Sequence, residues 1–328
     1  MAADSQDLRA RRTAALAHEK LGDVKAWTGD VRGAVADARE ALRHWGHLAG
    51  VQPGSAAARL SYAISTTKLG DLLGHPAFPN LGDRAEAERQ YRHALALLEA
   101  GGADSAGDWG RRRQIALDHE RLGAMLQLDD RWDEALAAFE RSLVLRQELS
   151  REDPTSTNAA RDVAVSREGL CRTHLAGGDL GAAMSQCSEA VGLYRSLRAA
   201  DSGNAQGVSD LALAQGAVSQ VLAARGRWSA ALSELDESTR LLRQFLRANP
   251  GNLPARRELA RHLLRSSVAH ARLASSGGAD QRLRHRDLAK ALYAGGLRAF
   301  SESAGPGRSV SDQGDERLAR EALAQLDR

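Results

Sequence analysis

Three stretches of the sequence carry the same pattern of residues at a constant spacing of 48 positions, seen at Leu122-Gly123, Leu170-Cys171 and Val218-Ser219. Each of these pairs is followed, after the same interval, by a buried-type alanine and then by a larger residue. A fixed period of tens of residues is the signature of a solenoid, in which one supersecondary unit is stacked repeatedly. The chain is therefore expected to fold as an array rather than around one large core.

The same unit can be traced with gaps toward both ends of the chain. Leu21-Gly22 and Leu69-Gly70 begin two earlier copies, and a degraded copy begins near Leu253. Turn-forming pairs such as Asp153-Pro154 recur between copies, close to residues able to cap the next helix. We expect one array over residues 1–300, with units at about 4–50, 54–100, 108–151, 155–200, 204–248 and 253–300, then a linker at 301–311 and a capping helix at 312–328.

The composition and the spacing of apolar residues indicate an all-α fold. Only 4% of the residues are aromatic, and β-branched runs are few. Leu136, Phe139 and Leu143 recur at helical spacing, which places them on one face of a helix. Each unit is therefore predicted to be two antiparallel helices of roughly 20 residues, joined by a tight turn.

Small residues in each unit predict where its two helices approach each other. Gly123 lies in the middle of a predicted helix, where glycine costs about 1 kcal/mol relative to alanine. We expect this glycine to face the alanine that recurs early in the second helix, with the larger residue four positions later filling the gap. The structural positions of the repeat are Leu21, Gly22, Ala34, Leu69, Gly70, Ala87, Tyr91, Leu122, Gly123, Ala135, Phe139, Ala183 and Ala231.

This pattern resembles the tetratricopeptide repeat, a helix–turn–helix unit of 34 residues. Leu122, Gly123, Ala135, Phe139 and Ser142 fall on five of its signature positions. The 48-residue period is longer, and helices extended by a turn or two would accommodate the difference. The resemblance implies a right-handed α-solenoid of about six stacked antiparallel helix pairs with a C-terminal capping helix.

A closer resemblance is to the long-helix variant of this repeat in the C-terminal half of bacterial serine/threonine protein kinases. Asp153-Pro154 and the segments 161–168 and 178–183 match its hinge and its two helices. The kinase itself is absent, because no Gly-rich phosphate loop, no Val-Ala-Ile-Lys strand and no Asp-Phe-Gly motif occurs in the sequence. The similarity covers roughly residues 8–300.

In arrays of this family the first helix of each pair lines the concave surface, where a peptide is usually held. Carrying these positions over gives the candidate binding residues Glu19, Asp23, Trp27, Thr67, Asp71, Glu120, Gln127, Glu168, Arg172 and Gln220. In one interpretation, the acids among them attract a basic segment of a partner protein. In the other, the segments 18–20, 66–68 and 119–121 form ion pairs between repeats, each worth ~0–1 kcal/mol when exposed.

Histidines and cysteines offer no convincing catalytic or metal-binding pattern. His44 and His262 are taken to lack cysteine or carboxylate neighbours in helical register, so structural roles are expected. Cys171 and Cys187 occupy core positions of one repeat and are interpreted as buried free thiols that act as small apolar residues. We expect no catalytic residues, no metal and no cofactor, and hence no enzyme.

The charge pattern argues against nucleic-acid binding. The chain has 45 Lys and Arg residues against 42 Asp and Glu residues, a formal net charge of only +3. A nucleic-acid-binding protein would more often cluster an excess of positive charge on one face. The N-terminus lacks the pattern of a signal peptide and no apolar run approaches 18 residues, so we expect a soluble cytoplasmic protein without a membrane segment.

Together these observations predict a non-catalytic scaffold for protein–protein interactions, which binds a partner segment in the concave groove of the array. One alternative is a regulatory or sensor region associated with a bacterial serine/threonine kinase. A lower-ranked alternative is a helical repeat that binds nucleic acid through its arginines. The partner, the pathway and the oligomeric state stay open, as does whether a kinase domain belongs to the same protein.

Overall fold

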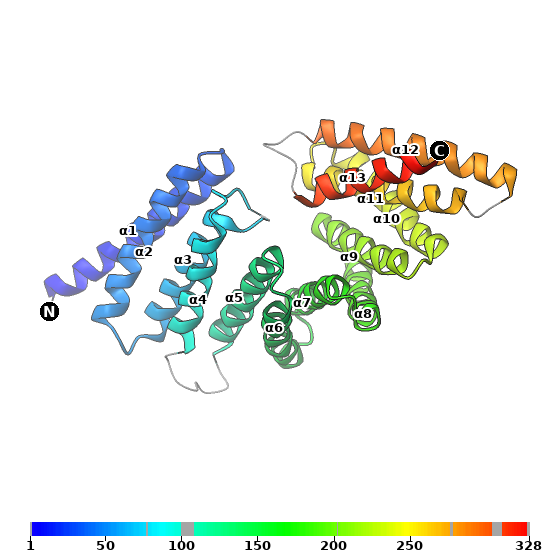
Figure 1. The fold of residues 1–328 in the computed structure, drawn as a ribbon. Coiled ribbons are helices and arrows are strands. Elements are labelled where there is room, and N and C mark those ends of the chain that lie inside the picture. The colour runs from blue at the N-terminus through cyan, green and yellow to red at the C-terminus, as the bar shows by residue number, and fades with distance from the viewer. Residues whose placement is uncertain are drawn as a thin grey trace. The chain divides into compact units, whose positions relative to one another are not determined.

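The structure is a computed structural model that describes residues 2–76, 78–99, 108–201, 203–275, 278–303 and 310–326. Within these ranges the chain forms thirteen α-helices and no strand (Figure 1). The helices are α1 (Ala2–Trp27), α2 (Val31–Val51), α3 (Ala56–Gly74), α4 (Arg84–Glu99), α5 (Trp109–Leu128), α6 (Trp132–Glu152), α7 (Thr157–Ala176), α8 (Leu180–Ala200), α9 (Ala205–Ala224), α10 (Trp228–Ala248), α11 (Leu253–Ala274), α12 (Ala279–Glu302) and α13 (Val310–Leu326).

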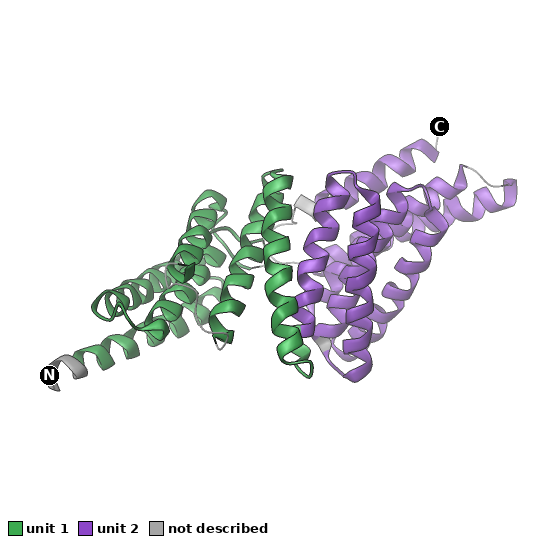
Figure 2. Ribbon diagram, turned by 90° about the horizontal axis from the view of Figure 1, so that it is seen from below, with its two compact units in different colours: residues 1–159 green, residues 160–328 purple. Residues whose placement is uncertain are grey.

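The helices belong to two compact units, Met1–Ala159 and Ala160–Arg328 (Figure 2). In the first unit α1 packs on α2, α3 on α4 and α5 on α6, and each pair contacts the next. In the second unit α8, α9, α10, α11 and α12 pack consecutively in the same way. This arrangement confirms the predicted all-α solenoid of stacked helical repeats.

The C-terminal helix covers the last helix pair, as predicted for a capping helix. α13 packs against α11 and, less extensively, against α12. Its Ala319 joins Leu264 of α11 and Phe300 of α12 in one apolar cluster. Residues 304–309 of the predicted linker lie outside the described residues, and α12 itself continues to Glu302.

Polar residues before several of the helices cap their first turns. The side chains of Ser55, Asn204 and Asn252 accept hydrogen bonds from backbone N–H groups in the first turns of α3, α9 and α11. Such a cap satisfies a donor that has no partner within the helix and typically contributes about 1 kcal/mol. The capping residues expected at the junctions therefore define the helix pairs.

Within a pair, the mid-helix glycine faces the large residue of the second helix. A Cβ atom on Gly123 would lie 2.8–3.0 Å from three ring atoms of Phe139. A Cβ atom on Gly70 would lie 2.7–3.1 Å from three ring atoms of Tyr91. The neighbour of Gly123 is thus Phe139 rather than the expected Ala135, because the aromatic ring itself fills the space that the missing side chain leaves.

The same contact in the fourth pair is made by two cysteines. Cys171 and Cys187 are buried and joined by a disulfide between α7 and α8, with Cα atoms 5.2 Å apart. The prediction of two free thiols is therefore wrong. Cys171 holds the repeat position of Gly123 and Cys187 that of Phe139, and two side chains at these positions meet across the helix pair.

Among the described residues, no helix has both the length and the apolar character needed to span a lipid bilayer.

Candidate functional site

In the first unit, polar side chains join the first helices of successive pairs into one layer. α1 is linked to α3 by a hydrogen bond from Ser65 to Glu19, and α3 is linked to α5 by an ion pair of Arg121 with Asp71. These helices carry seven of the ten predicted binding residues, and α7 and α9 carry the other three. We therefore traced the partners of each candidate in this layer.

Glu19 is held by three side chains from two neighbouring helices. Its Oε1 atom accepts hydrogen bonds from Trp45 Nε1 at 3.0 Å and from Ser65 Oγ at 2.5 Å. Its Oε2 atom lies 3.7 Å from Nζ of Lys68. The Glu19 carboxylate therefore links α1 to α2 and α3, and few of its hydrogen-bond acceptor sites remain for a partner protein.

Thr67 lies in a buried polar cluster between the second and third pairs. Its hydroxyl donates a 2.6 Å hydrogen bond to Oδ1 of Asp118, and Gln114 donates to both residues. Burial raises the pKa of Asp118 to about 7, although the hydrogen bonds from Thr67 and Gln114 oppose the shift. Thr67 is itself buried, so it contributes to stacking between repeats and is not available at the surface.

Asp71 and Glu120 each form ion pairs with neighbouring arginines. Asp71 accepts a 2.8 Å hydrogen bond from the Tyr91 hydroxyl and lies 3.1 Å from Nε of Arg121. Burial raises the pKa of Asp71 to about 6, against the opposing charge of Arg121. Glu120 lies 3.3 Å from Arg121 and 3.2 Å from Arg146, so its carboxylate is also paired within the unit.

These contacts match the second of the two interpretations drawn from the sequence. Lys68 bridges the first and second pairs through Glu19 and Asp23, and Arg121 bridges the second and third through Asp71. Because most of these groups are shielded from water, removing one partner would leave a poorly solvated charge and would destabilise the unit more than the loss of an exposed ion pair. The acids of α1, α3 and α5 thus act mainly between repeats.

The remaining candidates lie at separate places. Gln127 is partly buried in the last turn of α5. In the second unit, Glu168 is buried and pairs with Arg172 one turn along α7, while Gln220 is partly buried on α9. None of these contacts indicates a ligand.

Asp23 and Trp27 differ from the other candidates because they stand at an exposed face of α1. Trp27 is 90% exposed and Val24 is 61% exposed, and Leu16 and Leu21 are exposed as well. At 3.6 residues per turn, these four apolar side chains fall within roughly 140° of the helix circumference. We call this surface, formed by Leu16, Leu21, Val24 and Trp27, the α1 face.

The position of Leu21 in the repeat explains the α1 face. Leu69 and Leu122 hold the equivalent positions of the next two pairs and are 3% and 5% exposed, whereas Leu21 is 51% exposed. Leu69 packs in one cluster with Val35 of the preceding pair. Among the described helices, none packs on this side of α1 as α2 packs on α3, so the interface that is covered in the later repeats is open at α1.

The sequence pattern named Asp23 and Trp27 as candidate binding residues, but it placed Leu21 among the structural residues and so did not identify the apolar surface beside them. The sequence does carry a signal for the α1 face, because Leu16, Val24 and Trp27 are apolar residues of the first repeat at helical spacing. They add apolar area to the side of the helix that a preceding repeat would cover. An exposed apolar patch of this kind commonly marks an interaction site.

Comparisons with known proteins agree with the geometry of the repeats. No family model and no curated protein matches the sequence. Among solved structures, BtubC (BKLC) from P. vanneervenii is similar with a TM-score of 0.58 and 15% identity, over 85% of this chain and 96% of that one. The chain has a tetratricopeptide-like fold.

Two further solved structures are less similar. The nuclear import adaptor Nro1 of S. pombe has a TM-score of 0.49 at 10% identity, over 94% of this chain and 99% of that one. A tetratricopeptide repeat protein from Parabacteroides merdae has a TM-score of 0.40 at 12% identity, over 96% and 100% of the two chains. At these identities the similarity concerns the fold alone, and the closer resemblance to kinase-associated repeats stays a prediction.

Proposed function

We propose that this chain is a non-catalytic scaffold that binds a partner protein through the α1 face. The observation that carries the proposal is the exposure of Leu21, in contrast to the burial of Leu69 and Leu122 at the same repeat position. A helix from the partner would cover Leu21 as the preceding helix pair covers Leu69. This is the helix-in-groove mode of recognition, in which an amphipathic helix presents its apolar side.

The chemistry of the α1 face defines the partner further. Trp27 and Val24 would supply apolar anchors, and fully burying such a side chain contributes about 1.5–3 kcal/mol. Asp23 lies among these residues with a half-exposed carboxylate, 3.8 Å from Lys20 and 3.7 Å from Lys68. We therefore propose a partner helix with an apolar stripe and a lysine or arginine opposite Asp23.

The proposal is tested by affinity capture from the source lysate with the full chain as bait, followed by mass spectrometry. Val24→Asp and Trp27→Ala alter the α1 face, and Asp23→Lys reverses its charge. Val144→Asp is the matched control, because Val144 is 55% exposed on α6 of the same unit. A protein that binds the wild type and the control but none of the three α1 variants supports the proposal.

Two results would contradict it. One is a set of bound proteins that Val24→Asp and Trp27→Ala leave unchanged, since the α1 face would then play no part in binding. The other is loss of the partner from Val144→Asp as well, which would indicate that any new charge in the unit disrupts binding. Circular dichroism of each variant verifies that the helices are retained.

We also propose that this protein is cytoplasmic. Disulfides are rare in reducing compartments, so the state of Cys171 and Cys187 in cells bears directly on this point. Fractionation of the source cells with compartment markers tests it, and recovery in an extracytoplasmic fraction would contradict it.

A further inference from the structure

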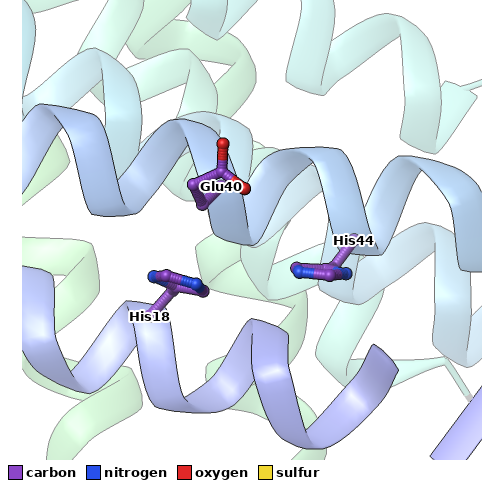
Figure 3. A group of neighbouring side chains, drawn as sticks. All are labelled: His18, Glu40 and His44. Atoms are coloured by element: carbon purple, nitrogen blue, oxygen red, sulfur yellow. The ribbon is translucent and has the colours of Figure 1, made fainter. Parts of the chain in front are cut away.

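Two histidines and a glutamate from the first helix pair converge outside the α1 face. His18 of α1 lies opposite Glu40 and His44 of α2, and one possible ligand atom from each lies within 4.8 Å of the other two (Figure 3). All three side chains are partly buried. Two imidazoles and one carboxylate are a donor set that binds divalent transition metals.

His18 is already oriented in the way that metal-binding histidines are. Its Nδ1 atom lies 2.9 Å from Oδ1 of Asp37, and because a carboxylate can only accept, the proton of the neutral ring is on Nδ1. The lone pair of Nε2 is then available to a metal. Asp37 is held in turn by Nζ of Lys25 at 2.5 Å. Such a carboxylate behind a histidine fixes the ring and its tautomer.

His44 supplies a nitrogen that lacks a partner. Its Nδ1 atom is buried and has no hydrogen-bond partner among the described residues. The ring is nearly parallel to that of His18, at an angle of 19° with the ring centroids 6.1 Å apart. Buried polar atoms are normally paired, and those that are not call for an explanation. A bound metal would order this ring by coordination to one of its nitrogens.

Glu40 stands one helical turn before His44, so both side chains leave the same side of α2. Its Oε2 atom currently accepts hydrogen bonds from Arg43, at 3.1 Å from Nε and 2.5 Å from Nη2. Both Glu40 and Arg43 are about half exposed. The carboxylate can therefore leave Arg43 and turn toward the histidines without disturbing the core.

We infer that His18, Glu40 and His44 form a binding site for a divalent transition metal of the zinc class. The remaining coordination positions would be taken by water or by a group from a bound partner. The site joins α1 to α2, so metal binding would secure the helix that carries the α1 face. It does not depend on the proposed partner, because His18, Glu40 and His44 all come from this chain and water can fill the remaining positions.

This inference corrects two expectations drawn from the sequence. His44 was taken to lack a carboxylate in helical register, yet Glu40 precedes it by four residues. His262 was taken in the same way, yet Glu258 precedes it by four residues and lies 3.1 Å from its Nε2 atom. The spacing i, i+4 could have identified both pairs, but only the fold brings His18 to the first of them.

The test is titration of the metal-free full chain with Zn²⁺ by isothermal calorimetry, with Co²⁺ absorption spectra to report nitrogen and oxygen ligands. The variants are His18→Ala, His44→Ala and Glu40→Gln. The matched control is His47→Ala, which removes an exposed histidine of the same helix. We expect one Zn²⁺ per chain and wild-type affinity in the control. Each ligand variant should bind at least about 10-fold more weakly, because loss of a ligand costs no less than loss of an outer-shell partner, which is typically about 10–100-fold.

Three outcomes would overturn the inference. They are wild-type affinity in all three ligand variants, loss of binding in His47→Ala, or no tighter Zn²⁺ binding by the wild type than by a His18→Ala/His44→Ala double variant. Should the histidine variants lose helical structure, Glu40→Gln decides, because its side chain is half exposed and the substitution keeps its shape. Arg43→Ala, which frees Glu40, is expected to bind Zn²⁺ at least as tightly as the wild type.

Discussion

Replacing Gly123 by alanine tests how the two helices of a repeat pack against each other. The new Cβ atom would lie 2.8, 2.9 and 3.0 Å from three ring atoms of Phe139. The ring cannot withdraw easily, because Phe139 is buried between α5 and the neighbouring helices. Overpacking of this kind typically costs about 1–3 kcal/mol.

Gly123→Ala also stabilises the helix itself, and a control substitution can measure that contribution separately from the overpacking. Alanine is favoured over glycine inside a helix by about 1 kcal/mol. Gly192 of α8 is exposed, and nothing lies within 4 Å of a Cβ atom built on it, so Gly192→Ala should show this gain alone. The difference in unfolding free energy between the two substitutions should therefore equal the overpacking cost of ~1–3 kcal/mol.

Hydrogen exchange followed by mass spectrometry is the appropriate assay, because it reports the local stability of each unit separately. We expect faster exchange in α5 and α6 of Gly123→Ala and slower exchange in α8 of Gly192→Ala. Phe139→Leu in the Gly123→Ala background should restore much of the lost protection, since the smaller side chain makes room. A stabilising effect of Gly123→Ala equal to that of Gly192→Ala would refute the packing described here.

Two further predictions concern Asp118 and the disulfide. Asp118 has a pKa of about 7 in the folded state and an ordinary value of 3.8, so it holds its proton more tightly when the protein is folded. Its contribution to the free energy of unfolding therefore falls as the pH rises from about 4 to 7, by up to ~1.4 kcal/mol per pH unit. Asp118→Asn should remove this part of the pH dependence of urea unfolding between about pH 4 and 7, and identical pH profiles for both proteins would contradict it. Cys171 and Cys187 of the native chain should resist alkylation in denaturant until a reductant is added; two thiols labelled without reductant would show that the disulfide does not form.

Features that depend on one repeat or one junction could be predicted from the sequence. The 48-residue period and the capping residues are local signals, and they gave helix pairs that the structure confirms. The aromatic residue opposite Gly123 was also recognisable as the large member of a packed contact. In contrast, the pairing of Cys171 with Cys187 was missed, although their repeat positions are those of Gly123 and Phe139.

The candidate binding residues were harder to predict because their environment depends on how repeats stack. A position carried over from related arrays cannot reveal that Trp45 and Ser65 both donate to Glu19, or that Thr67 meets Asp118 from the next pair. The first helix pair is a further difficulty, since the leucine of the repeat is exposed on α1 and buried on α3 and α5. Side-chain partners between repeats therefore have to come from the structure.

The central claim is that the α1 face binds a partner protein, and site-specific photo-crosslinking in the source cells tests it most directly. A benzoylphenylalanine residue would replace Val24 on the α1 face or, as the control, Val144 on α6, both of which are exposed. The account predicts a covalent adduct from position 24 alone, in which the crosslinked peptide of the partner is an amphipathic helix with a basic residue. The absence of an adduct at position 24, or the same adduct from both positions, would contradict it.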